Sequence, residues 1–171
     1  MQKILTEKEL AQFEGIDFLH GTNDCYSLIR KFYQISFGIT LTNYARPDDW
    51  WNLDFDLYNK YIRRENFYLI NQDKTQDWKY GDLILMAIKS TQPCHAAVYL
   101  GKGKILHHFY GRKSSIELYK GIWHNTTVSV FRHKDVSIEP EYEKLGITED
   151  ERVKYQLFLL ERRARERGNN N

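Results

Sequence analysis

The sequence predicts an α+β fold, with N-terminal helices packed on an antiparallel β-sheet. Before Trp78, apolar residues recur every three or four positions, which is the period of an amphipathic helix. After Trp78 they form short runs bounded by turn residues, which is typical of strands. Two of these runs flank Gly101-Lys102-Gly103, a short loop that favours a hairpin and hence antiparallel pairing. Helices followed by consecutive strands indicate the α+β class.

Two helices are expected near the N-terminus. Thr6 and Glu9 fit a capping box at the start of a short helix, although the same residues are compatible with a frayed turn. A longer helix has Asn23 or Asp24 as its N-cap and ends at Gly38, because glycine accepts the left-handed conformation that terminates helices. Its apolar face is formed by Cys25, Leu28, Ile29, Phe32 and Ser36.

The middle of the chain carries one more helix and the strands. The helix is expected in segment 50–62, after the acidic residues Asp48 and Asp49, which favour a helix N-terminus. The expected strands cover residues 82–88, 94–100, 104–110 and 126–133.

The end of the chain differs in composition. From Lys134 onward it is charged, and Thr148 with Glu151 forms a capping box for a last helix over 148–167. We therefore expect a domain over residues 1–133 and a charged C-terminal extension with one amphipathic helix over residues 134–171.

The composition limits the classes of protein to which the chain can belong. Its 171 residues include 25 basic and 23 acidic side chains, a net charge of +2, which argues against a nucleic-acid partner. Hydrophobic residues make up 42%, enough for a core, yet no apolar run approaches the roughly 20 residues of a membrane span. The first residues lack the apolar stretch of a signal peptide, so we expect synthesis in a cytoplasm with reduced thiols.

Cys25 is the candidate nucleophile. It opens the predicted second helix, where free amide groups and the helix dipole stabilise a thiolate and lower the thiol pKa. The alternative is a small apolar filler, because the residue shares the apolar face of that helix.

A cysteine nucleophile needs a histidine base, which in turn needs an orienting partner. His95 lies on the first hairpin strand, and His107 and His108 lie on the second, where neighbouring side chains point to opposite faces. A three-residue loop pairs position i with 204 − i, which makes His107 the diagonal neighbour of His95. A two-residue loop would put His108 there instead. We favour the three-residue loop, which leaves Cys94 on the opposite face, in the core.

A metal site is the other chemistry that these residue types allow. The six histidines and two cysteines contain no CxxC or HxxxH pair, so we expect neither a metal nor another cofactor. His20, His124 and His133 are interpreted as surface or interface residues.

The segments HGTNDCYSLIRKFY (20–33), WKYGDLILM (78–86) and CHAAVYLGKGKILHH (94–108) resemble the NlpC/p60 cell-wall cysteine peptidases. Within that family, NYARPDDWW (43–51) and Tyr26 are similar to the branch found in phage tail assembly and tail-tip proteins. The resemblance implies a papain-like fold and a catalytic triad of Cys25, His95 and His107. It also implies hydrolysis of amide bonds in peptidoglycan stem peptides, after γ-D-glutamate.

The resemblance extends to substrate, partners and location. We expect His20, Asp24, Tyr26 and Arg46 to bind the substrate, peptidoglycan. Helix 148–167 is expected to dock on tail-tip proteins or on a neighbouring copy of the chain, with packing against its own domain as the alternative. The protein would be made in the host cytoplasm and act from the virion tail on the bacterial wall, or in tail assembly. Two alternatives stay open, namely a structural tail assembly protein with little or no catalysis, and an amidase or acyl transferase on the same fold.

The sequence also departs from the family pattern. Tyr26 follows the cysteine where many members have serine, and Phe18 replaces a tyrosine that is common upstream. Tyr26 is bulkier, so we expect a narrower or reshaped substrate groove.

Overall fold

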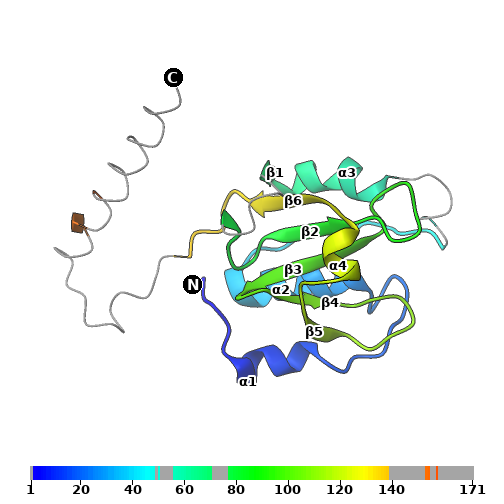
Figure 1. Ribbon diagram of the computed structural model, residues 1–171, viewed down its shortest axis with the longest axis horizontal. Coiled ribbons are helices and arrows are strands. Elements are labelled where there is room, and N and C mark those ends of the chain that lie inside the picture. Colours follow the sequence, from blue (N-terminus) through cyan, green and yellow to red (C-terminus); the bar gives the residue numbers. More distant parts are fainter. Residues whose placement is uncertain are drawn as a thin grey trace. The chain divides into compact units, whose positions relative to one another are not determined.

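A computed structural model describes residues 2–48, 50, 56–70, 77–138, 153–154 and 157. Contacts divide the chain into two compact units, residues 1–138 and 139–171. The first unit holds the helices and strands that Figure 1 labels. Residues 134–138 belong to it, since the Lys134 amide donates to the Asn66 carbonyl and Val136 and Ile138 pack against its core.

The N-terminal helices begin and end where the capping residues indicate. The expected capping box of Thr6 and Glu9 is confirmed, with both of its hydrogen bonds formed. Asp24 is the N-cap of the long helix, and Gly38 ends it in the left-handed conformation. The helices are α1 (Glu7–Leu10), α2 (Cys25–Phe37), α3 (Leu57–Ile62) and α4 (Ile122–Asn125), with short 3-10 turns at Ala11–Phe13 and Arg63–Glu65.

Six strands in the described residues form one antiparallel sheet, in the order β1-β6-β2-β3-β4-β5. They are β1 (Phe67–Ile70), β2 (Leu83–Met86), β3 (His95–Gly101), β4 (Lys104–His107), β5 (Ser115–Leu118) and β6 (Thr127–His133). The expected α+β class is therefore confirmed. Sequence patterns predicted the four inner strands and missed β1 and β5, the two edge strands.

The turn between β3 and β4 differs from the expected three-residue loop. Gly101 pairs with Lys104, so the turn has two residues, and Lys102 and Gly103 both have positive φ angles, 51° and 68°. A bulge between Tyr99 and Gly101 then shifts the register. Ala97 consequently pairs with His107, as the three-residue loop predicted, although the loop itself is shorter.

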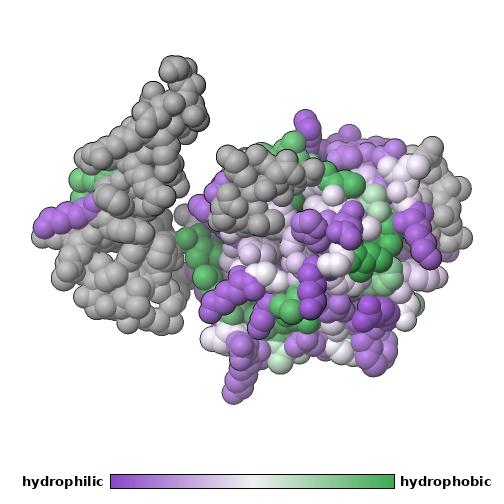
Figure 2. Space-filling model, in the orientation of Figure 1, coloured by the Kyte–Doolittle hydropathy of each residue, from purple (hydrophilic) through white to green (hydrophobic). Residues whose placement is uncertain are grey.

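The two faces of the sheet are covered by different elements. Leu83, Leu85 and Val98 belong to the core cluster that includes the apolar side chains of α2. Ile84, Met86 and Ala97 belong to a second cluster, which Trp123 of α4 completes. Figure 1 shows α2 behind the strands and α4 in front of them. On this front face, hydrophobic and hydrophilic side chains mix in small patches (Figure 2).

The Gly81-Asp82 pair fixes the entry into β2. Gly81 has a φ of 92°, and a Cβ built there would lie 2.5 Å from the ring of Phe37, so only glycine fits. The Asp82 carboxylate accepts the Lys79 amide and forms two hydrogen bonds of 2.7 Å with Arg132 of β6. These contacts connect the turn before β2 both to α2 and to β6.

The expected last helix falls largely outside the described residues. Val153, Lys154 and Leu157 are helical, and all three are exposed. Among the described residues, no helix is long and apolar enough to cross a membrane.

Candidate active site

Cys25 is the first residue of α2, and Asp24 fixes that helix end. The Ser27 amide donates to Oδ1 of Asp24, while the Gly21 amide and the Arg46 guanidinium donate to Oδ2. Burial raises the pKa of Asp24, but the Ser27 amide and Arg46 outweigh it and hold the pKa below its usual value. The expected substrate-binding residues Asp24 and Arg46 thus form a buried ion pair of 2.7 Å, with both carboxylate oxygens occupied.

The thiol of Cys25 lies against a tyrosine from α3. Its Sγ is 3.1 Å from the hydroxyl of Tyr58, which is within hydrogen-bond distance. Burial, reinforced by the Asp24 carboxylate, raises the pKa of Cys25 to about 11. The expectation of a lowered pKa at this helix end is therefore wrong for the resting protein. Desolvation of the thiolate outweighs the hydrogen bonds from Tyr58 and the Ala96 backbone.

His95 and His107 form a hydrogen-bonded pair on the α4 face of the sheet. Nε2 of His95 lies 3.1 Å from Nδ1 of His107, and both rings are buried. Burial lowers the pKa of His95 well below its usual value and also lowers the pKa of His107. Both imidazoles are therefore neutral near pH 7, and Nδ1 of His95 is the nitrogen not used in the pair.

Polar groups continue behind His107. Its Nε2 lies 3.4 Å from Oε1 of Glu117 and 3.5 Å from the hydroxyl of Ser115, both on β5. Trp123 packs against the His107 ring, with centroids 4.4 Å apart, and donates its indole N–H to Oε2 of Glu117 over 2.9 Å.

Cys25 and His95 line the same cleft, which has a volume of about 540 Å³. Of the four residues expected to bind substrate, His20, Asp24 and Arg46 also line it, whereas Tyr26 lines a different pocket. Nε2 of His20 lies 3.0 Å from the Arg46 carbonyl oxygen, so these two cleft residues are in contact.

Cys94 packs against the core cluster that includes the apolar side chains of α2, as expected, but it is only half-buried. It also lines the cleft, and its Sγ accepts the Ile88 amide over 3.3 Å. The cause is that β3 begins only at His95, so Cys94 belongs to the preceding loop. Both cysteines are free thiols.

His108 lies on the other side of the chain from His107. Its ring contacts Phe18 edge-on, with centroids 5.3 Å apart, and it lines the cleft. Its Nε2 is buried without a hydrogen-bond partner in the described structure. The register through the β-bulge therefore selects His107, and not His108, as the partner of His95.

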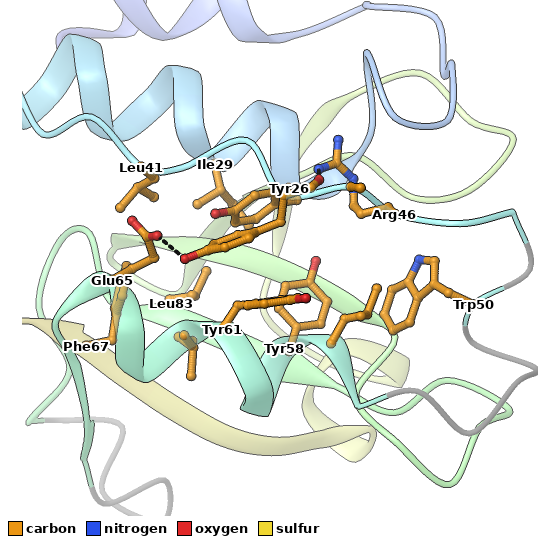
Figure 3. Close-up of a pocket in the computed structure, with 14 residues that line it drawn as sticks. Tyr26, Ile29, Leu41, Arg46, Trp50, Tyr58, Tyr61, Glu65, Phe67 and Leu83 are labelled. Carbon is orange, nitrogen blue, oxygen red and sulfur yellow. Dashed lines mark hydrogen bonds between the residues drawn. The ribbon is translucent and has the colours of Figure 1, made fainter.

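A second pocket lies between α2 and α3 and is lined mostly by apolar and aromatic side chains. Figure 3 shows Tyr26 and Ile29 on the side of α2 facing Tyr58 and Tyr61 of α3. Arg46, Trp50 and Tyr58 line this pocket and the cleft alike, so Tyr58 belongs to the wall between them.

Sequence reasoning missed two residues of the site, Tyr58 and Glu117. Tyr58 lies in the segment predicted as a helix, but no pattern distinguished it from the other aromatics there. Glu117 lies on the edge strand β5, which was not predicted at all. No group of three or more His, Cys, Asp or Glu among the described residues could hold a metal ion.

A cysteine at a helix N-terminus, beside a sheet that carries a hydrogen-bonded histidine pair, defines the papain-like class of folds. Within that class, the model of the NlpC/P60 family matches residues 14–132, and the chain belongs to this family. The match includes Cys25, His95 and His107.

Two phage proteins are similar to this chain in sequence. Tail tip assembly protein K of Escherichia phage lambda is 36% identical over 120 residues, covering 70% of this chain and 58% of that protein. Its counterpart in Escherichia phage N15 is 30% identical over 128 residues, covering 70% of this chain and 48% of that protein. The chain thus spans about half the length of these curated relatives.

A solved structure shares the fold. A lipoprotein-like NLP/P60 family protein of Staphylococcus aureus superposes with a TM-score of 0.51 at 21% identity, covering 73% of this chain and 39% of that one.

Proposed function

We propose that the protein is a cysteine peptidase that hydrolyses amide bonds in peptidoglycan stem peptides, with Cys25 as nucleophile and His95 as base. The observation that carries the proposal is the hydrogen-bonded pair of buried, neutral imidazoles, of which His95 lines the same cleft as Cys25. A buried histidine pair of this kind holds one ring in a fixed orientation, which is what a general base requires.

The pKa values define how the reaction begins. With the Cys25 thiol and both imidazoles neutral at rest, proton transfer and attack are coupled. Nδ1 of His95 takes the thiol proton as Sγ bonds to the amide carbon, and the carbonyl oxygen becomes an oxyanion. The Cys25 amide, at the free N-terminus of α2, donates to that oxyanion.

The remaining steps return the residues to their first state. The C–N bond breaks as His95 gives its proton to the leaving amine, which leaves a thioester on Cys25. Water then attacks the thioester while His95 accepts its proton. The acid product departs, and the thiol is protonated again.

The relatives supply the biological setting of the proposal. Their names describe tail tip assembly proteins of phages. We therefore place this chain's action at a phage tail, where cleaving peptidoglycan opens the wall locally. Its partners would be the other proteins of the tail tip.

A second candidate is a role in tail assembly with little or no catalysis. The observation that favours it is the resting state of Cys25, whose thiol is half-buried and at hydrogen-bond distance from Tyr58, with a pKa raised to about 11. A protein that keeps only the fold has no need of a reactive thiolate.

Product identification separates the two. Purified peptidoglycan is incubated with the protein, and the soluble fragments are analysed by mass spectrometry. The peptidase proposal predicts fragments with a new carboxyl group on glutamate and a new amine on the following residue. Intact stem peptides after prolonged incubation would leave the assembly role as the better account.

A further inference from the structure

Glu117 is the last member of a row of polar groups that runs from the cleft to the edge of the sheet. Nε2 of His95 meets Nδ1 of His107 at 3.1 Å, and Nε2 of His107 meets Oε1 of Glu117 at 3.4 Å. In His107, Nδ1 thus faces His95 and Nε2 faces Glu117 of β5. In His95, Nε2 faces His107, and Nδ1 is the other ring nitrogen. The direction in which the protons point along this row decides which nitrogen of His95 is free.

A carboxylate at the end of the row fixes that direction, because it only accepts hydrogen bonds. Burial raises the pKa of Glu117, but hydrogen bonds from Trp123 and Ser115 outweigh it and lower the pKa below its usual value. Glu117 is thus ionised near pH 7, and Nε2 of His107 must carry the proton between them. Nδ1 of His107 then accepts, and Nε2 of His95 donates to it.

The consequence is that Nδ1 of His95 has no proton and can act as a base. We infer that Glu117 is a positioning residue, which acts through His107 to set the tautomer of His95. This inference rests on the proposed peptidase function for its catalytic meaning, but the tautomers themselves belong to the resting protein.

The surroundings of Glu117 hold its carboxylate in place. The Ser115 hydroxyl donates to Oε1 over 3.0 Å, Arg112 approaches the same oxygen at 3.2 Å, and Trp123 holds Oε2 over 2.9 Å. The groups that face His107 are thus His95 from β3, Glu117 and Ser115 from β5, and Trp123 from α4. Two further groups, the Arg112 guanidinium and the His108 imidazole, lie close enough to lower the pKa of His107.

Nitrogen NMR of the full chain labelled with ¹⁵N-histidine reads these tautomers directly. Near pH 7 the wild-type protein is expected to show His95 and His107 both protonated at Nε2. Protonation of His107 at Nδ1 in the wild-type protein would overturn the inference without any variant. The NMR sample contains no substrate, so the tautomers are read independently of activity. A protein that does not cleave peptidoglycan but shows the expected tautomers would refute the proposed function and leave this inference standing.

Glu117→Gln tests the role in catalysis. The amide keeps the size of the side chain but offers an N–H to His107, so the tautomer of His107 is expected to change and kcat to fall roughly 10- to 1000-fold with KM within about twofold. Glu14→Gln is the matched control, because Glu14 accepts the Ile116 amide on the same strand instead of facing the ring. Unchanged kcat and unchanged tautomers in Glu117→Gln would overturn the inference.

Arg112→Gln gives a second test that does not depend on altering a buried group. The Arg112 side chain is 57% exposed, so the fold should tolerate its loss. The positive charge of Arg112 lowers the pKa of His107, and Glu117 raises it. The pKa of His107 is therefore expected to rise in Arg112→Gln, while His95 and His107 each keep the proton on Nε2. A pKa that stays fixed or falls in this variant would contradict the network.

Discussion

The hydroxyl of Tyr58 lies 3.1 Å from the sulfur of Cys25, so a tyrosine from α3 contacts the candidate nucleophile of α2. Tyr58 itself is buried, and burial raises its pKa well above the usual value, so it stays a phenol. A neutral phenol beside a thiol can donate to the sulfur and stabilises the thiolate as it forms.

Removal of that hydroxyl should therefore make Cys25 less reactive. A hydrogen bond of this kind contributes roughly 0.5–1.5 kcal/mol, so Tyr58→Phe is expected to slow alkylation of Cys25 by iodoacetamide roughly 2- to 10-fold. Tyr61→Phe is the matched control, because Tyr61 lies on the same helix and stacks on Tyr44 with centroids 4.0 Å apart. Alkylation in Tyr58→Phe as fast as in Tyr61→Phe would show that the contact does not tune the thiol.

The raised pKa of Cys25 predicts how its reactivity changes with pH. Only the thiolate reacts, and with a pKa of about 11 the thiolate fraction grows about tenfold for each pH unit below that value. The alkylation rate of Cys25, followed by peptide mass spectrometry, should therefore rise steadily from neutral to strongly basic pH. A rate that levels off below about pH 8.5, the ordinary thiol pKa, would indicate a thiolate at rest instead.

The two adjacent histidines should respond differently to substitution. His107→Ala leaves Cys25 and His95 in place but misaligned, so turnover of peptidoglycan is expected to fall roughly 10- to 1000-fold. His107→Gln should keep part of the activity, because its amide can still bond to His95. His108→Ala should alter the melting temperature more than the rate, since its ring packs on Phe18. Loss of turnover in His108→Ala alone would mean that the assigned partner of His95 is wrong.

Gly81 should tolerate no side chain. In Gly81→Ala the new Cβ meets the Phe37 ring, whereas in Gly111→Ala it meets nothing within 4 Å, and both residues have positive φ angles of 92° and 69°. Gly81→Ala should thus be less stable by about 1–3 kcal/mol beyond the backbone strain that the two variants share. Urea unfolding of both variants measures the difference, and equal losses would show that the Phe37 contact relaxes freely.

The sequence was most informative where local rules act alone. The capping box, the start of α2 at Cys25 and the pairing of His95 with His107 all follow from spacing and parity. The hairpin differs from its prediction in two ways, and the two differences cancel in the strand register. The turn has two residues rather than three, and the bulge near Leu100 restores the predicted pairing.

What the sequence did not predict depends on tertiary contacts. Tyr58 reaches Cys25 only because α3 packs beside α2, and Glu117 reaches His107 only because β5 pairs with β4. The pKa of Cys25 likewise depends on how deeply the thiol is buried, which the helix position alone does not give.

The central claim is that Cys25 is the nucleophile of a peptidoglycan hydrolase. It is tested most directly by comparing variants of the protein's two cysteines. The measurement is the rate at which purified peptidoglycan releases soluble fragments with wild-type protein, Cys25→Ala and Cys94→Ser. Cys94 is suited as the control because it is also a free thiol in the cleft, and its sulfur bonds to the Ile88 backbone. The account predicts no release above background for Cys25→Ala and most of the wild-type rate for Cys94→Ser. Release by Cys25→Ala at the wild-type rate would contradict it.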